Sequence, residues 1–358
     1  MVGVNSGYRA NLDCIESQPR PQRVMSVRMH VDNGAMRAEA LWYVASGRAE
    51  LRQESVSVPK DGEILVRAIF GALSRGTERL VHSGRVPASE HARMRAPRMG
   101  GAFPFPVKYG YAVVGRVEGG SADLLNRIVF VLHPHQTLFT VPGDTACVVP
   151  EHVPAQRAVL AANMETALNA MWDAAPGPAD RIAVVGGGLI GLLVARLCAV
   201  LPGAEVTVVD IAPSRCELAR TMGARFAAPG DAPGDCDVVF HVSGTAAGLA
   251  TALRLAGDEA SIVELSWYGA GDVPVPLGEA FHSRRLRLVS SQVGQVASSR
   301  RPRWSTRRRL AAAVALLSDP ALDQLIAPAI SFRDLPAGLA SVLDPQSDVV
   351  CQLIRYSS

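Results

Sequence analysis

Lysine is nearly absent from this chain of 358 residues: only Lys60 and Lys108 occur, and every other basic side chain outside the histidines is an arginine. The formal net charge of +3 is too small to predict nucleic-acid binding by itself. An arginine bias usually reflects genome composition. Lys108 nevertheless draws attention, because it lies inside a glycine-containing motif described below.

Paired cysteines are missing as well. The six cysteines are scattered, and none forms a C-x-x-C pair: Cys14, Cys147, Cys198, Cys216, Cys236 and Cys351. This spacing argues against a disulfide framework and against a structural zinc site. It predicts reduced, mostly buried thiols and a cytoplasmic protein.

Long apolar runs and a leader segment are also absent. The longest apolar run, Ile182 to Ala195, is short for a bilayer span and contains four glycines. No charged segment followed by an apolar one and a cleavage site opens the chain. With 48% apolar and 19% charged residues, the sequence predicts a soluble globular enzyme with no membrane partner, and its length predicts two domains.

The first half of the chain changes character twice. Residues 1–35 are polar and show no periodicity, so we expect an N-terminal extension outside the core. Residues 40–150 contain short strand-like segments separated by turn signals such as Pro59–Gly62, which predicts an all-β region. An alanine-rich helical stretch begins after Pro154.

Strands and helices alternate in the second half. The expected strands are 181–185, 204–210, 236–243, 260–266 and 284–291, and the expected helices between them are 189–201, 214–224 and 244–257. This alternation predicts right-handed crossovers and a parallel sheet. An arginine-rich segment, a helix over 307–319 and a last strand over 349–356 follow.

A glycine loop stands directly after the first of these strands. Gly186 permits a tight turn, Gly188 lets the backbone approach a pyrophosphate, and Gly191 allows close helix–strand contact. The helix that follows begins at Leu189 and Ile190, and its N-terminal N–H groups favour an anion. The spacing G-x-G-x-x-G in this context predicts dinucleotide binding.

The next strand ends in an acidic residue, Asp210. A carboxylate there accepts hydrogen bonds from the adenosine ribose and repels a 2′-phosphate, so NAD is expected rather than NADP. Arg215, five residues later, would sit on the ribose or meet a phosphate. Ser243, at the end of the following strand, completes the expected cofactor set.

Several segments together carry a resemblance. Asn126–Phe130 (NRIVF), Met164–Ala170 (METALNA) and the glycine loop are similar to segments of the medium-chain dehydrogenase/reductase superfamily. The resemblance covers roughly residues 40–358. It implies an α/β fold with a GroES-like β-rich domain (36–163 and 292–358) and a Rossmann domain (164–291). It also implies a cleft between the domains, a C-terminal segment that returns to the first domain, and a homodimer through the outer edge of the nucleotide sheet.

The zinc-binding branch of that superfamily carries C-x-[ST]-D, then G-H-E, then a later Cys. In this chain the corresponding positions hold non-ligands: Arg75, Tyr111, Ala112 and Ala162. Because a catalytic zinc needs about three protein ligands, we expect no metal. Thr77 falls on the hydroxyl residue that relays the substrate proton, Glu78 falls on the Asp, and Thr166 matches a threonine near the nicotinamide.

The chain more closely resembles a zinc-lacking branch that includes bacteriochlorophyllide hydroxyethyl dehydrogenases. The segments that carry this likeness are SRGTE with LVHSGRVP, YGYAVVGRV, FVLHPHQ and NMETALNAMWDAAP. A tetrapyrrole substrate does not follow from it.

Without a metal, hydrogen-bond donors must stabilise the oxygen of the substrate carbonyl. Thr77 and Tyr111 are the first candidates; Thr77 would otherwise bond backbone in a turn. A desolvated Lys108 would serve as an acid, a base or a carboxylate clamp, and a solvated lysine is the alternative. His133 and His135 would join a proton relay, be structural or exposed, or supply half of a metal site.

Six arginines gather in Arg300–Arg309 beside Trp304. They would grip an anionic substrate through bidentate pairs, or lie solvated at a helix start. No aromatic platform or DNA-reading motif accompanies them, so no nucleic-acid partner is expected. Trp267 and Tyr268 would contact the cofactor or pack in the core.

These observations predict a zinc-independent, NAD-dependent oxidoreductase that interconverts a hydroxyl and a carbonyl on a small organic substrate. Two alternatives remain open at this point. One is an NAD(P)H-dependent reductase of an activated C=C bond, and the other is a nucleotide-binding protein without catalysis.

Overall fold

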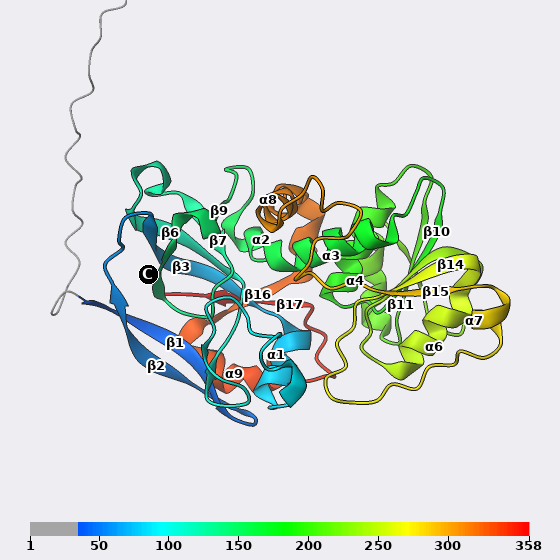
Figure 1. Cartoon of the computed structure of the whole chain (residues 1–358), viewed down its shortest axis with the longest axis horizontal. Coiled ribbons are helices and arrows are strands. Elements are labelled where there is room, and N and C mark those ends of the chain that lie inside the picture. The colour runs from blue at the N-terminus through cyan, green and yellow to red at the C-terminus, as the bar shows by residue number, and fades with distance from the viewer. Residues whose placement is uncertain (1–34, 358) are drawn as a thin grey trace, which may run out of the picture.

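The computed structural model describes residues 35–357, so the expected N-terminal extension lies outside the described residues except for Ala35. Figure 1 shows a β-rich half and an α/β half, with helices α3 (Ala161–Ala174) and α8 (Thr306–Leu316) between them on one side. In the described part of the chain, no helix is long and apolar enough to cross a membrane.

Two mainly antiparallel sheets form the β-rich half. Their strand orders are β2-β1-β5-β4 and β16-β17-β3-β6-β7-β9, and β8 also pairs with β3. The strands from the first part of the chain are β1 (Ala35–Ala45), β2 (Arg48–Ser57), β3 (Glu63–Leu73), β4 (Gly100–Gly101), β5 (Val107–Lys108), β6 (Val113–Gly120), β7 (Ile128–Val131), β8 (Leu138–Pro142) and β9 (Cys147–Val148). Their inward side chains form one apolar core, which includes Tyr43, Val66 and Phe139.

The expectation of an all-β region over residues 40–150 is wrong at one place. Helix α1 (Arg75–His82) stands between β3 and β4, and it contains most of the residues of the motif SRGTE. The backbone N–H of Ser74, its N-cap, donates to Glu78 Oε1 at 2.8 Å, so a side chain from the first turn satisfies the helix entry. Its eight residues include only two large apolar side chains, Leu80 and Val81, so the segment offers no apolar repeat that would reveal a helix.

The α/β half is built on a six-stranded sheet with the order β12-β11-β10-β13-β14-β15, in which every pairing is parallel. Its strands are β10 (Arg181–Val185), β11 (Glu205–Val209), β12 (Arg225–Ala227), β13 (Cys236–His241), β14 (Ala256–Glu264) and β15 (Arg287–Ser290). The helices between them are α4 (Leu189–Ala199), α5 (Cys216–Thr221), α6 (Ala246–Leu255) and the short α7 (Ala280–Ser283). The predicted parallel sheet is confirmed, and β12 is an addition to it.

The end of the chain returns to the β-rich half, as expected. Strand β17 (Cys351–Arg355) pairs antiparallel with β3, with Gln352 opposite Leu73. It also pairs in parallel with β16 (Ile326–Ser331), and helix α9 (Leu335–Val342) connects the two strands. The predicted fold class is therefore confirmed, whereas the exact domain boundaries stay a prediction.

Helices α3 and α8 are joined by a buried ion pair. Arg309, only 2% exposed, donates from Nε to Glu165 Oε1 at 3.0 Å and from Nη1 to Asn169 Oδ1 at 2.5 Å. Its guanidinium also donates to the carbonyls of Gln295 and Val293. Burial raises the pKa of Glu165, and Arg309 acts against that rise. This arginine of the 300–309 cluster therefore has a structural partner.

Replacing Arg309 by Met should lower the free energy of unfolding by roughly 3–5 kcal/mol, because Glu165 would keep a buried carboxylate without its cation. Arg308→Met is the matched control: Arg308 is exposed and lies 4.0 Å from the centroid of the Trp304 ring, so its loss should cost about 1 kcal/mol or less. Urea unfolding measures both values, and equal losses would contradict this role for Arg309.

Candidate active site

The glycine loop joins β10 to α4 with backbone geometry that needs glycine. Gly186 has φ +116°, in the left-handed region, and a Cβ there would lie 2.8 Å from the Ser243 backbone nitrogen. A Cβ on Gly191 would lie 1.9 Å from the Gly186 carbonyl oxygen, so α4 packs directly on the turn. A Cβ on Gly188, the N-cap of α4, would meet nothing within 4 Å, which leaves open space beside the helix N-terminus.

Asp210 lies at the edge of this loop. Its Oδ2 accepts from the Gly187 backbone N–H at 2.6 Å, and its Oδ1 accepts from the Ala212 N–H at 2.8 Å. A Cβ on Gly187 would lie 3.1 Å from Cβ and Cγ of Arg215. The structure thus brings together the loop, Asp210, Arg215 and Ser243, all of them expected cofactor residues.

Ser243 belongs to a chain of polar groups that the sequence did not reveal. Its Oγ lies 2.7 Å from Nε2 of the fully buried His241, and His241 Nδ1 lies 2.6 Å from Glu264 Oε2. The hydroxyl of Tyr268 donates to the same Glu264 oxygen at 3.0 Å. Burial raises the pKa of Glu264, but hydrogen bonds from His241 and Ser266 outweigh it and leave that pKa below its ordinary value.

Strand register explains this meeting. His241 and Glu264 end two neighbouring parallel strands and stand opposite each other in the pairing of β13 with β14. The carboxyl ends of parallel strands are where ligands bind in sheets of this kind. A polar residue at the end of each strand was therefore the signal that could have identified the pair.

Two of the expected catalytic residues meet at the start of α1. The Tyr111 hydroxyl donates to Ser74 Oγ, while Tyr111 and Thr77 are both half-buried. Burial raises the pKa of Tyr111, against the lowering effect of hydrogen bonds with Ser74 and Thr77. The phenol is consequently a protonated donor at neutral pH.

A buried carboxylate lies behind this pair. Glu78 Oε2 accepts from the Tyr43 hydroxyl at 2.6 Å and lies 3.0 Å from His135 Nε2, and Glu78 Oε1 accepts from the Ser74 N–H. The Tyr356 hydroxyl lies 3.5 Å from His135 Nδ1. Both Glu78 and His135 have no exposed surface, so His135 supports α1 from inside the core.

The structure does not bring Lys108 and His133 to that pair. Lys108 Nζ lies 2.5 Å from Glu54 Oε2 on β2 and donates to Gln136 Oε1 at 2.9 Å. The His133 ring stacks on Phe139 with centroids 3.8 Å apart, and burial lowers the pKa of His133 to about 3. Lys108 is held in an ion pair and His133 is a buried neutral histidine, so both lie apart from Thr77 and Tyr111, and a catalytic role for either stays a prediction.

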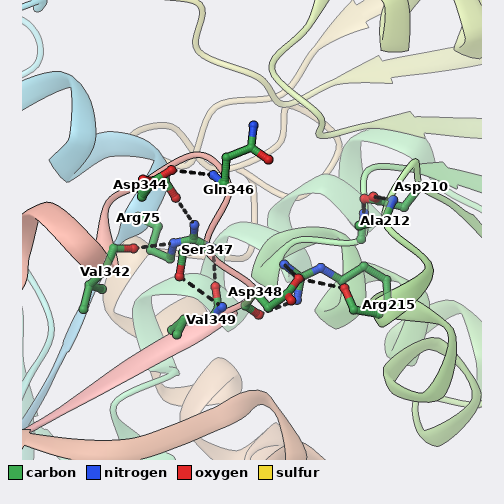
Figure 2. Close-up of polar contacts among 12 residues, drawn as sticks. Arg75, Asp210, Ala212, Arg215, Val342, Asp344, Gln346, Ser347, Asp348 and Val349 are labelled. Carbon is green, nitrogen blue, oxygen red and sulfur yellow. Dashed lines mark hydrogen bonds and ion pairs between the residues drawn. The ribbon is translucent and has the colours of Figure 1, made fainter.

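Arg75 and Ala162, two of the positions at which the resemblance predicts no metal ligand, make contacts of other kinds. Arg75 Nε donates to the Val342 carbonyl at 2.9 Å, and its Nη2 donates to the Asp344 carbonyl at 2.7 Å (Figure 2). Ala162 lies buried in α3, where its carbonyl accepts from the Thr166 hydroxyl at 3.0 Å. Within residues 35–357 no group of three or more His, Cys, Asp or Glu side chains is placed to hold a metal ion.

The arginine cluster and the pair Trp267 and Tyr268 make contacts within the protein. In the arginine cluster, Arg301 Nε donates to the Val296 carbonyl, and Arg300 lies over the Trp172 ring at 5.7 Å from its centroid. Trp267 packs against the apolar core of the β-rich half, while Tyr268 faces Glu264.

No protein-family model and no curated protein matches the chain, but solved structures do. L-idonate 5-dehydrogenase from Escherichia coli K-12 superposes with a TM-score of 0.75 at 16% identity, over 90% of this chain and 99% of that one. An alcohol dehydrogenase from Escherichia coli CFT073 complexed with NADH gives 0.71 at 16% identity, over 89% and 99% of the two chains. 2R,3R-butanediol dehydrogenase from Bacillus subtilis gives 0.68 at 17% identity, again over 89% and 99%. Similarity at these identities shows the fold alone: the chain has the fold of these dehydrogenases.

Proposed function

We propose that this chain is an NAD(H)-dependent oxidoreductase that interconverts a hydroxyl and a carbonyl on a small organic substrate without a catalytic zinc. One observation carries the proposal: the glycine loop, Asp210 and Ser243 meet at the carboxyl edge of the parallel sheet. That edge is the nucleotide-binding position in folds of this kind.

The loop fits a dinucleotide. Space is open at Gly188, the first turn of α4 has no side-chain cap, and its N–H groups and dipole favour a pyrophosphate. Each Asp210 oxygen accepts one backbone N–H and keeps a further lone pair for a ribose hydroxyl. When bound, the nicotinamide ring would supply or accept the hydride.

Uncharged hydrogen-bond donors would stabilise the substrate oxygen. Hydride transfer to a carbonyl leaves negative charge on oxygen, which zinc absorbs in the metal-dependent branch. Here Arg75, Ala112 and Ala162 occupy ligand positions and offer no suitable ligand, while Tyr111 and Thr77 lie together. We assign proton donation to Tyr111 and positioning of the substrate oxygen to Thr77.

Binding of the reduced cofactor is the first test. The purified protein should bind NADH more tightly than NADPH, as followed by the change in nicotinamide fluorescence, and should contain no stoichiometric zinc. Gly188→Val should weaken NADH binding because its side chain would fill the open space at the loop. A preference for NADPH would favour reduction of an activated C=C bond instead. Binding without turnover on alcohols, ketones and enones would favour a protein without catalysis.

Tyr111→Phe and Thr77→Val should each lower kcat about a hundredfold, because each removes one donor from the substrate oxygen. The dissociation constant for NADH should change little. Thr77→Ser, which keeps a hydroxyl, should restore most of the activity. Tyr109→Phe is the matched control: the Tyr109 ring lies 6.1 Å from the Tyr111 ring and donates no hydrogen bond to it. If both hydroxyl-deleting variants keep full turnover, this assignment is wrong.

Ser243→Ala should weaken NADH binding several-fold, about the value of one neutral hydrogen bond. His241→Gln should have a similar effect, because His241 acts through Ser243. The double variant should then bind NADH no more weakly than the single variant with the lower affinity. Additive losses of binding free energy in a double-mutant cycle would contradict the coupling of the two residues.

The pH dependence of Glu264 has a definite sign. Because its pKa is lowered in the folded state, the pair with His241 stabilises the fold fully above the ordinary carboxyl pKa of about 4.3 and loses that effect as the pH falls from there through the lower folded-state pKa. Glu264→Gln should therefore destabilise the protein at pH 7, and this loss should shrink steadily as the pH is lowered below about 4.3. Thermal unfolding of both proteins over a series of pH values measures the difference, and a loss that does not change with pH would contradict it.

A further inference from the structure

The segment between α9 and β17, residues 343–350, leaves the β-rich half and reaches the nucleotide sheet (Figures 1 and 2). Arg75 fixes it at both ends. The guanidinium donates to the carbonyls of Asp344 and Val349 in this segment and to that of Val342, the last residue of α9, so one side chain holds the backbone at both ends of the segment.

At its far end the segment carries Asp348 to the turn after β11. Asp348 Oδ1 accepts from the Ser214 hydroxyl at 2.7 Å and lies 3.9 Å from Arg215 Nη2. The Asp348 carbonyl accepts from Arg215 Nη1 at 2.6 Å. Figure 2 shows Asp348 between Arg75 and Arg215, with Asp210 beyond.

The chemistry of this turn suits a phosphate. A hydroxyl from Ser214 and the guanidinium of Arg215 stand within five residues of Asp210, the residue expected to hold the adenosine ribose. Arg215 also packs against Gly187 of the glycine loop. A guanidinium with a neighbouring hydroxyl is a preferred partner for phosphate oxygens. In this chain the anion that they meet is the Asp348 carboxylate.

Building on the proposed function, we propose that Asp348 is a specificity residue that excludes a 2′-phosphorylated dinucleotide. Its carboxylate accepts from the Ser214 hydroxyl and lies 3.9 Å from the Arg215 guanidinium, the two groups that a 2′-phosphate would need, and it adds a second negative charge to that of Asp210. Arg75 is the positioning residue that holds the segment so that Asp348 reaches Arg215. Selection against the phosphate thus comes from two carboxylates on different parts of the chain.

How strongly the Asp348 charge changes the affinity for NADPH depends on how exposed the carboxylate is to solvent. The Asp348 side chain is 75% exposed and that of Arg215 only 10%, so solvent screens the carboxylate while the guanidinium stays in place. Removing one exposed charge near a phosphate of charge about −2 should change affinity about tenfold, not a thousandfold.

The test is a pair of dissociation constants, for NADPH and NADH, measured by fluorescence titration of the full chain. Asp348→Asn should tighten NADPH binding about tenfold and change NADH binding less than twofold. Asp344→Asn is the matched control, because it removes an exposed carboxylate from the same segment that lies away from Arg215. Asp344→Asn should leave the ratio of the two constants unchanged.

Arg75→Gln should shift the same ratio towards NADPH, and Arg75→Lys should do so as well because an ammonium lacks the planar fork that holds three carbonyls. If the Arg75 variants weaken the binding of NADH and NADPH equally, the effect is purely structural and the role of Arg75 is overturned.

The proposal for Asp348 is overturned if the wild-type protein binds NADH but Asp348→Asn leaves the ratio of the two dissociation constants unchanged or weakens the binding of both cofactors equally. Wild-type protein that binds neither cofactor overturns the proposed function itself.

Discussion

The candidate site depends first on the contact between Gly191 and Gly186. A Cβ on Gly191 would lie 1.9 Å from the Gly186 carbonyl oxygen, so helix α4 can begin this close to β10 only without a side chain there. That contact places the N-terminus of α4 at the carboxyl edge of the sheet. Gly187 then donates to Asp210, and Gly186 lies against Ser243. One backbone contact therefore aligns residues that follow three neighbouring strands of the sheet, β11, β10 and β13.

A second constraint is the carboxylate of Glu78. A buried charge is costly unless its lone pairs are satisfied, and here Tyr43, His135 and the Ser74 N–H surround it. The network ties the first turn of α1 to β1 and to the residues after β7. Thr77 and Tyr111 are adjacent because this turn cannot shift without leaving the carboxylate unpaired. A polar network inside the core thus holds this part of the candidate site in place.

Much of the nucleotide half could be predicted from sequence, because apolar strands, alternating helices and the glycine spacing are local signals. The rest depends on contacts between distant residues. Glu78 meets Tyr43 and His135 across 35 and 57 positions, so neither the burial of His135 nor helix α1 follows from the motif SRGTE. The ion pair of Lys108 with Glu54 depends on how β1 aligns with β2 and β5. His241 and Glu264 meet because of strand register, which local pattern does not specify.

Arg75 links helix α1 to the C-terminal part of the chain. Its long side chain reaches the backbone between the end of α9 and the start of β17 and donates to three carbonyls. Burial and the neighbouring Arg215 lower the pKa of Arg75, yet a guanidinium stays charged at any physiological pH. The link between α1 and the C-terminal segment therefore uses a permanent charge.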